Sequence, residues 1–167
     1  MTKVIICRGI QGSGKSTWAS NWVQKDPANR IRINWDELRL MMGGGPDGYW
    51  VPKREKMPVL SRILELMITT AIEYEKDIVI DNMNLNPNTV NDIIGMISRS
   101  SQYAEEDKPV EVYVKSFYTD VDVCVERDSK RTRPVTEKVI RACYARYPEY
   151  FAHTDNITKT LLEYTEE

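Results

Sequence analysis

The residues with the clearest chemical meaning lie near the N-terminus, in the run Gly9-Ile-Gln-Gly-Ser-Gly-Lys-Ser16. This run matches the phosphate-binding pattern G-x-x-x-x-G-K-[ST] and stands between a strand-like segment and a segment with helical spacing. Glycines let successive backbone N–H groups turn toward phosphate oxygens, and the start of the following helix favours negative charge. The sequence therefore predicts a nucleotide site formed by Gly9, Gly12, Ser13, Gly14, Lys15, Ser16 and Thr17.

Two side chains of this P-loop have specific expected roles. Lys15 is expected to reach the β- and γ-phosphates of ATP, and the Ser16 hydroxyl is expected to ligate Mg²⁺. A P-loop alone does not distinguish a kinase from a motor or a switch. We favour phosphoryl transfer, because 167 residues leave room for little beyond a nucleotide, an acceptor and a lid.

Two acidic residues follow strand-like runs, where open α/β sheets bind ligands. Asp36 is the candidate general base for an acceptor hydroxyl, and Arg39 lies three residues on, on the same face if the segment is helical. The guanidinium suits an acceptor phosphate. The alternative for this pair is an N-cap aspartate and a surface arginine. Asp81 is a candidate Mg²⁺ ligand, followed by Asn82 and Asn84, which are expected to form a turn.

A basic run, Arg127-Asp-Ser-Lys-Arg-Thr-Arg-Pro134, lies between two predicted helices. An arginine that closes over the γ-phosphate stabilises developing charge and is worth about 10³–10⁵ in rate. Runs of this kind are usually only solvated helix ends. Because this one follows a P-loop, we interpret residues 127–135 as a lid, with Arg131 as the finger and Arg127 as a second nucleotide contact.

The elements that must position these residues alternate along the chain. Strands are predicted at 3–8, 30–34, 77–81 and 110–117, and helices at 15–25, 36–42, 58–75, 87–98, 119–131 and 136–147. Such alternation predicts parallel strands with right-handed crossovers. We expect an α/β fold: a P-loop kinase-like three-layer sandwich with a mainly parallel sheet of four or five strands and an Arg-bearing lid. Thr119 and Asp122 are expected to cap the fifth helix.

Composition predicts one ordinary soluble domain over residues 1–167, with an acidic C-terminal tail at about 149–167. No apolar run approaches the roughly 20 residues of a membrane span, so we expect a cytoplasmic protein. The net charge is −2, yet residues 1–60 hold ten Lys and Arg against five Asp and Glu. The charge therefore weakens only the idea of broad nonspecific binding along a nucleic-acid duplex.

Taken together, these motifs resemble the phage polynucleotide 5′-hydroxyl kinase family. The resemblance covers roughly residues 3–147 and rests on Gly-Ser-Gly-Lys-Ser-Thr-Trp18, Ile33-Asn-x-Asp36 with Arg39, Asn84-Leu-Asn-Pro87, and Arg127-x-x-x-Arg131. It implies transfer of the γ-phosphate of ATP, with Mg²⁺, to the 5′-hydroxyl end of DNA or RNA. The implied partner is therefore single-stranded or end-exposed nucleic acid, with no membrane. A homo-oligomer is left open, and the compartment is the cytoplasm of the host cell if the chain is phage-encoded.

The resemblance also implies roles for individual residues. It assigns Lys15 and Ser16 to ATP and Mg²⁺, Asp36 to the base, Arg39 to the acceptor phosphate and Arg131 to the lid. It departs from relatives at Asp81-Asn-Met-Asn84, where a threonine is expected at the position of Met83, so the acid is either Asp81 or stands at position 82. Beside the base, Trp35 is a candidate for stacking on a terminal base.

Two other functions fit the same motifs. A P-loop kinase of this kind could phosphorylate a hydroxymethylated base in phage DNA, or a small hydroxylated metabolite. A protein of another class, a non-catalytic nucleotide-binding regulatory module, would bind ATP without transferring phosphate. The Gly-rich segment 43–50 is either a flexible acceptor loop or a surface connection.

Overall fold

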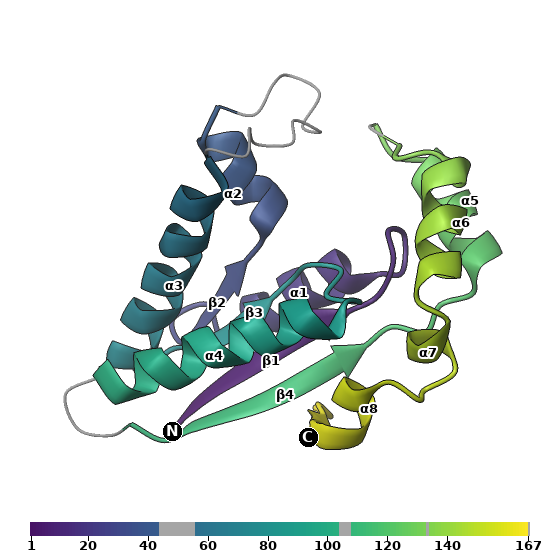
Figure 1. Cartoon of the computed structure of the whole chain (residues 1–167). Coiled ribbons are helices and arrows are strands. Elements are labelled where there is room, and N and C mark those ends of the chain that lie inside the picture. Colours follow the sequence, from purple (N-terminus) through teal and green to yellow (C-terminus); the bar gives the residue numbers. More distant parts are fainter. Residues whose placement is uncertain (44–55, 104–107, 133, 167) are drawn as a thin grey trace.

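A parallel β-sheet forms the centre of the protein (Figure 1). The computed structural model describes residues 1–43, 56–103, 108–132 and 134–166. Five strands lie in the order β2-β3-β1-β4-β5, and each adjacent pair is parallel. The strands are β1 (Thr2–Arg8), β2 (Arg30–Ile33), β3 (Asp77–Ile80), β4 (Val110–Ser116) and β5 (Leu162–Glu163). The predicted α/β class is confirmed.

Helices connect the strands, and the first six lie close to the predicted positions. They are α1 (Lys15–Gln24), α2 (Trp35–Met41), α3 (Met57–Glu73), α4 (Pro87–Tyr103), α5 (Val121–Ser129), α6 (Glu137–Arg146), α7 (Pro148–Phe151) and α8 (Asn156–Thr160). Among the described helices, none has the length and apolar character needed to cross a membrane. The Gly-rich segment discussed above lies almost wholly outside the described residues, which stop at residue 43 and resume at residue 56.

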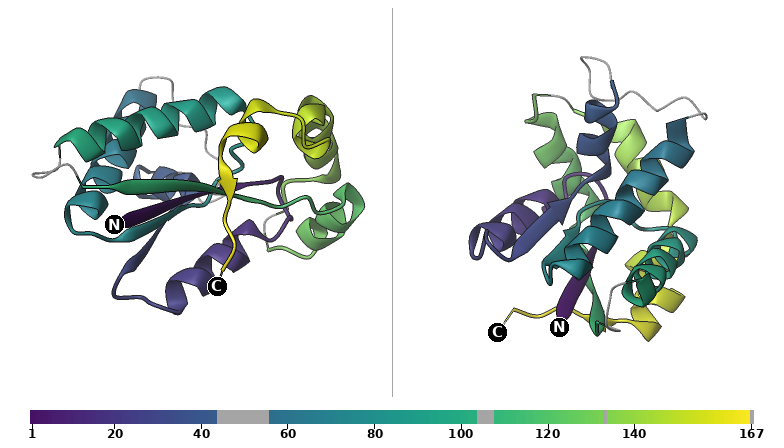
Figure 2. Two further views of the ribbon diagram at one scale, coloured as in Figure 1. Left: turned by 90° about the horizontal axis from the view of Figure 1, so that it is seen from below. Right: turned by 90° about the vertical axis from the view of Figure 1, so that its left-hand side faces the viewer.

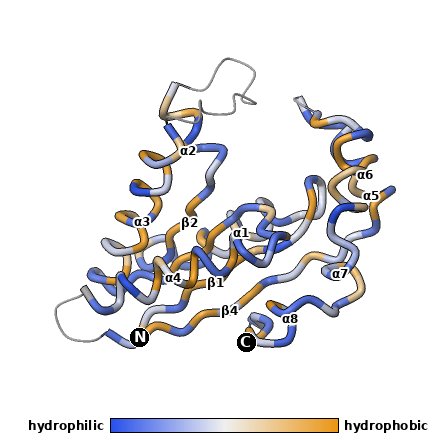
Figure 3. The backbone as a smooth tube through the Cα atoms, in the orientation of Figure 1, coloured by the Kyte–Doolittle hydropathy of each residue, from blue (hydrophilic) through white to orange (hydrophobic). Residues whose placement is uncertain are grey.

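The sheet separates two helical layers, as the left view of Figure 2 shows. Alternate residues of a strand point to opposite faces, so Ile5 packs against Trp22 of α1, whereas Ile6 packs with Leu64 of α3 and Ile93 of α4. All five side chains are buried. Strand β1 is buried on both faces from Val4 to Cys7, whereas β4 alternates hydrophobic and hydrophilic residues, as its alternating colours in Figure 3 show, and Val114 is its one buried residue. The predicted three-layer arrangement is thus present.

The predicted cap of α5 at Thr119 is wrong. The Asp120 carboxylate accepts the backbone N–H of Asp122 at 2.8 Å and caps the helix. Thr119 instead donates its hydroxyl to the carbonyl of Ser13 at 2.9 Å. A capping aspartate one residue nearer the helix frees the threonine to hold the P-loop.

The acidic C-terminal segment folds back onto the sheet, although no element was predicted there. Figure 1 shows α7 and α8 in yellow beside the end of β4, and β5 extends the sheet by pairing with β4. Tyr164 is buried and accepts a hydrogen bond from the Trp22 indole at 3.1 Å. Earlier in the same segment, Asp155 forms an ion pair with the fully buried Arg8 at 2.6 Å. Burial of these side chains makes the segment part of the core.

The Asp155 contacts predict a pH-dependent contribution to stability. Burial raises the pKa of this carboxyl, but hydrogen bonds from Arg8 and Thr158 outweigh burial and hold the pKa below its ordinary value of 3.8. A lowered folded-state pKa stabilises the protein above the unfolded-state pKa, and this contribution is lost as the pH falls through the folded-state value. The difference in unfolding free energy between wild type and Asp155→Asn should therefore be constant near neutrality and shrink below pH 3.8. Urea titrations across this range measure it, and an unchanged difference in acid would contradict it.

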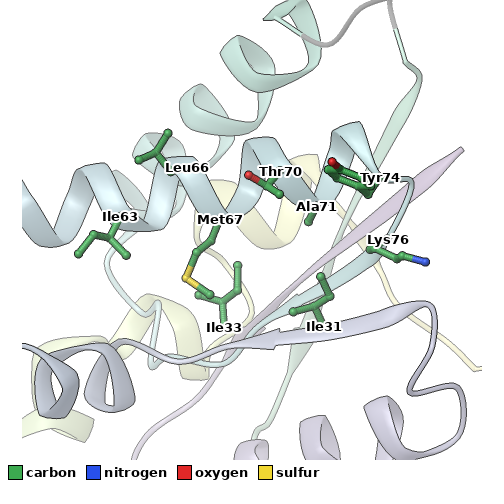
Figure 4. Close-up of a pocket in the computed structure, with 9 residues that line it drawn as sticks. All are labelled: Ile31, Ile33, Ile63, Leu66, Met67, Thr70, Ala71, Tyr74 and Lys76. Carbon is green, nitrogen blue, oxygen red and sulfur yellow. The ribbon is translucent and has the colours of Figure 1, made fainter.

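An apolar cavity of about 500 Å³ lies between the edge strand β2 and helix α3 (Figure 4). Its lining consists of Ile31, Ile33, Ile63, Leu66, Met67, Thr70, Ala71, Tyr74 and Lys76. Aliphatic side chains form most of these walls, and they are poorly suited to binding a phosphate group. Among the described residues, none lines both this cavity and the polar cleft where the predicted site lies.

Candidate active site

A polar cleft of about 560 Å³ lies at the C-terminal ends of the strands. The sheet order places the segments that follow β2, β3, β1 and β4 next to one another along this edge. They are helix α2, the connecting segment 81–86, the P-loop (residues 9–16) and helix α5, whose end overlaps the predicted lid. Among the predicted site residues, the cleft is lined by Gly12, Gly14, Lys15, Ser16, Thr17, Trp35, Asp36, Arg39, Asp81 and Arg131. Most of the predicted site is therefore brought together.

The P-loop presents donors to this cleft. The Lys15 ammonium donates to the Ile10 carbonyl at 2.7 Å and to the Ser13 hydroxyl at 3.3 Å. Burial lowers the pKa of Lys15, although nearby Asp81 acts in the opposite direction. Gly14 occupies the N-cap position of α1 without a side-chain cap, so the first N–H groups of the helix suit an anion. A phosphate in this loop would offset the cost of burying the lysine charge.

Two predicted loop residues lie behind the cleft rather than along it. The Gly9 N–H donates to the Met83 carbonyl at 3.0 Å, and Ser13 is buried with its hydroxyl toward Lys15. Both therefore shape the loop. A Cβ at Gly9 would lie 2.7 Å from the Ser13 hydroxyl oxygen and 3.0 Å from the Phe117 Cβ, so this packing requires a glycine.

Helix α2 presents an acidic and a basic side chain, Asp36 and Arg39, to the cleft. Asp36 is paired with Arg39 at 2.9 Å, and 73% of the aspartate side chain is exposed. The N-cap alternative for Asp36 is wrong, because the Asn34 side chain accepts the Glu37 N–H at 3.1 Å and caps the helix. A residue in extended conformation directly before the first turn is the one placed to cap it. The carboxylate of Asp36 is thus available to a ligand.

Trp35 lies beside this pair. The Arg39 guanidinium carbon stands 5.5 Å from the centre of the Trp35 ring, and the Trp35 backbone N–H donates to the Asn82 side chain at 2.9 Å. The indole nitrogen and Arg39 Nε have no hydrogen-bond partner among the described residues. Both donor atoms are buried, and Asn82 fixes the start of α2.

Asp81 is the acidic residue buried at the end of β3. Its Oδ2 accepts from Arg32 at 2.7 Å, and Arg32 also contacts Glu37 of α2 at 2.6 Å. The Asp81 side chain is almost fully buried, yet its Oδ1 has no partner among the described residues. An unpaired carboxylate oxygen lining the same cleft as the Ser16 hydroxyl fits the oxygen donors that Mg²⁺ prefers. Between the two registers considered for the acid, the carboxylate at position 81 fits a metal, whereas Asn82 holds α2.

The two arginines of the predicted lid, Arg127 and Arg131, occupy different positions. Arg131 lines the cleft and lies 3.5 Å from the buried Asp128 carboxylate. The other carboxylate oxygen of Asp128 accepts the Val135 N–H at 2.8 Å, which ties the lid turn to helix α5. Arg127 donates to the Gly12 carbonyl at 3.5 Å, beside the P-loop. Position 133 lies outside the described residues.

Residues 4–150 match the family model for the AAA domain, AAA_33. The chain belongs to this family. The match begins in β1, contains the P-loop and the predicted lid, and ends at Tyr150 in α7, so it spans most of the cleft.

Solved structures with a fold similar to that of this AAA domain include a chain of an RNA repair complex and two small-molecule kinases. A chain of the Pnkp1/Rnl/Hen1 RNA repair complex is 22% identical, with a TM-score of 0.70, over 92% of this chain and 45% of that one. The APS kinase CysC of Mycobacterium tuberculosis is 15% identical, with a TM-score of 0.50, over 99% and 84% of the two chains. A gluconokinase from Sinorhizobium meliloti 1021 is 14% identical, with a TM-score of 0.50, over 89% and 74%. This AAA domain spans less than half the length of the repair-complex chain that it matches.

Sequence reasoning missed part of the cleft of this AAA domain. Met83, Leu85 and Asn86 line it from the segment after β3, and Tyr147 lines it beyond α6. Asn84, expected to form a turn, adopts a left-handed conformation with φ of 47°. The alternation of asparagines in this segment was an available signal, since asparagine tolerates such conformations. The position of Tyr147 had no local signal.

The three cysteines of the AAA domain are poorly suited to act as nucleophiles. Burial raises the pKa of each thiol, most strongly for Cys7, and this opposes formation of the reactive thiolate. None of the three is among the described residues that line the cleft, whose lining carries carboxylate, hydroxyl, lysine and arginine groups.

Proposed function

We propose that this protein is an ATP- and Mg²⁺-dependent kinase of polynucleotide 5′-hydroxyl ends. One observation carries the proposal: four functional segments line one cleft in the order set by the sheet. Asp36 and Arg39 follow β2, Asp81 follows β3, Lys15 follows β1 and Arg131 lies beyond β4. An acceptor site, an acid, a phosphate-binding loop and a lid arginine thus succeed one another across the edge of the sheet.

The cleft residues divide the work of phosphate transfer. The Asp36 carboxylate takes the proton of the 5′-hydroxyl while the hydroxyl oxygen bonds to the γ-phosphorus of ATP. The bond between this phosphorus and the ADP oxygen breaks at the same time. Lys15 and Arg131 donate to phosphate oxygens as charge moves onto them. When bound by Ser16 and Asp81, Mg²⁺ neutralises charge on the phosphates. ADP and a 5′-phosphorylated end are the products.

The acceptor side supports a nucleotide end over a simple hydroxyl compound. Arg39 offers a fork of donors that suits the phosphate next to a terminal nucleoside, and Trp35 offers an aromatic ring beside it. The Trp35 backbone is fixed by Asn82, so the ring stands on a supported element. The likeness to a chain of an RNA repair complex agrees with this assignment.

Labelled ATP tests the proposed function directly. The protein, with Mg²⁺, is incubated with 5′-hydroxyl DNA and RNA oligonucleotides, with their 5′-phosphorylated forms, and separately with nucleosides, gluconate and DNA that contains hydroxymethylated bases. We expect label only on the 5′-hydroxyl oligonucleotides, and none when Lys15→Met replaces the wild type. Transfer only to another acceptor, or tight ATP binding with no transfer to any of them, would show that the proposal is wrong.

A further inference from the structure

Arg8 is an arginine in the interior of the protein. It is the last residue of β1, directly before the P-loop, and its exposed fraction is 0%. Arginine is almost never fully buried unless it is paired, because removing its charge from water is costly. A buried arginine next to the P-loop must therefore have partners that compensate its charge.

The guanidinium of Arg8 binds two separate parts of the chain. Its Nε donates to the Asn84 carbonyl at 3.0 Å, and Nη2 lies 3.4 Å from the Leu85 carbonyl. On the other side, Nη1 and Nη2 bind the two Asp155 oxygens at 3.2 and 2.6 Å, and Nη1 reaches the Thr158 hydroxyl at 3.3 Å. The planar fork of donors is therefore shared between the cleft segment and α8.

The cleft segment 81–86 is tied to the P-loop strand by further bonds. The Asn84 side chain donates to the Cys7 carbonyl at 2.8 Å, and the Gly9 N–H donates to the Met83 carbonyl at 3.0 Å. The left-handed conformation of Asn84 turns the backbone so that these bonds and the Arg8 bonds form together. This segment begins with the buried carboxylate that fits a metal, so its position sets the geometry of the cleft.

The C-terminal segment meets Arg8 at a second point. The Tyr150 hydroxyl donates to the Arg8 carbonyl at 2.7 Å and accepts the Phe117 N–H at 3.0 Å. The Tyr150 ring centre lies 4.9 Å from the Arg8 guanidinium carbon. Asp155 is in turn fixed as the N-cap of α8 by the Thr158 N–H at 2.8 Å. Both the backbone and the side chain of Arg8 are thus held by residues of one segment.

We propose that Arg8 is a positioning residue, and that Arg8, Tyr150 and Asp155 form a buried clamp through which the C-terminal segment holds residues 81–86 against the P-loop. This proposal rests on the proposed function only where its effect is measured as a rate of phosphate transfer. Buried ion pairs are weak contributors to net stability, so a role in fixing geometry accounts for the cost of this one. A displacement of about 1 Å in a reacting geometry can cost about 10²-fold in rate.

The test uses the full chain with the double substitution Arg8→Met/Asp155→Asn. This removes both buried charges together, and asparagine retains the capping oxygen of α8. In the folded protein we expect ATP affinity close to wild type, kcat lower by about 10- to 100-fold, and faster amide hydrogen exchange in residues 81–86. Arg8→Lys keeps a charge beside Asp155 but lacks the fork, and we expect partial recovery of kcat and of exchange protection.

A control and a second readout make the outcomes decisive. Arg99→Met/Glu65→Leu removes another ion pair, one that joins α4 to α3 outside the cleft at 2.9 Å, and should leave kcat unchanged. If the folded double variant and Arg8→Lys both keep wild-type kcat and wild-type exchange in residues 81–86, the clamp is wrong. If the double variant does not fold, Arg8→Lys decides by the same two measurements. If the wild type transfers phosphate to no acceptor, the proposed function fails, whereas the exchange measurement still decides the clamp.

Discussion

Replacement of Asp36 by asparagine is expected to lower kcat for phosphate transfer by about 10²- to 10⁴-fold, the range that a general base contributes. Asparagine has nearly the same shape but does not take up the hydroxyl proton. ATP affinity should stay at the wild-type value, because the phosphate-binding groups lie on the P-loop and α1. Folding should also be preserved, since 73% of the Asp36 side chain is exposed and Asn34 caps the helix. Single-turnover transfer and calorimetric ATP binding measure the two quantities.

The matched control for this prediction is Asp122→Asn. Asp122 is also 73% exposed and also pairs with an arginine, Arg141, at 2.6 Å, but it does not line the cleft. Its replacement should leave kcat unchanged, which isolates position in the cleft from the general effect of removing a surface carboxylate. If Asp36→Asn kept full activity, Asp36 would not be the general base. If the variant bound ATP more weakly than wild type, Asp36 would contribute to the nucleotide site instead.

Replacement of Gly12 by alanine is expected to disable the P-loop. Gly12 has φ of 79°, and a Cβ there would lie 2.4 Å from the Cys124 carbonyl oxygen in α5. The left-handed conformation alone costs an L-residue roughly 1–2 kcal/mol, and contact with a backbone atom forces the loop or helix α5 to move. A binding cost of about 1.4 kcal/mol or more would weaken ATP by about tenfold or more.

Gly43→Ala separates the two causes. Gly43 has a similar φ of 88°, but no atom of the described residues lies within 4 Å of its Cβ position. This variant carries the conformational cost without the clash, so it should lose some unfolding free energy and keep wild-type ATP affinity. Thermal unfolding and ATP titration of both variants measure the difference. Equal ATP affinities for the two variants would show that close contact between the P-loop and α5 is not required.

Much of the fold could be predicted because its determinants are local in the sequence. The P-loop pattern, the apolar strand-like runs and the helical spacing each depend on neighbouring residues, and their alternation implies parallel pairing. The same locality allowed Asp36 and Arg39 to be placed on one face, since residues three apart on a helix are neighbours. The cap of α2 was less predictable, because Asn34 and Asp36 are both good capping residues and the helix start decides between them.

Tertiary structure alone decided the contacts that complete the site. Arg32 meets Asp81 across 49 residues, and Arg8 meets Asp155 across 147. No local pattern signals such pairs, because they form only after the order β2-β3-β1-β4-β5 and the return of the C-terminal segment have brought distant strands and helices together. The sequence by itself determined which chemical groups the protein carries and at which strand ends they stand. Packing determined which of them are buried, paired or left free for a ligand, because burial and pairing depend on neighbours that the chain supplies from far away.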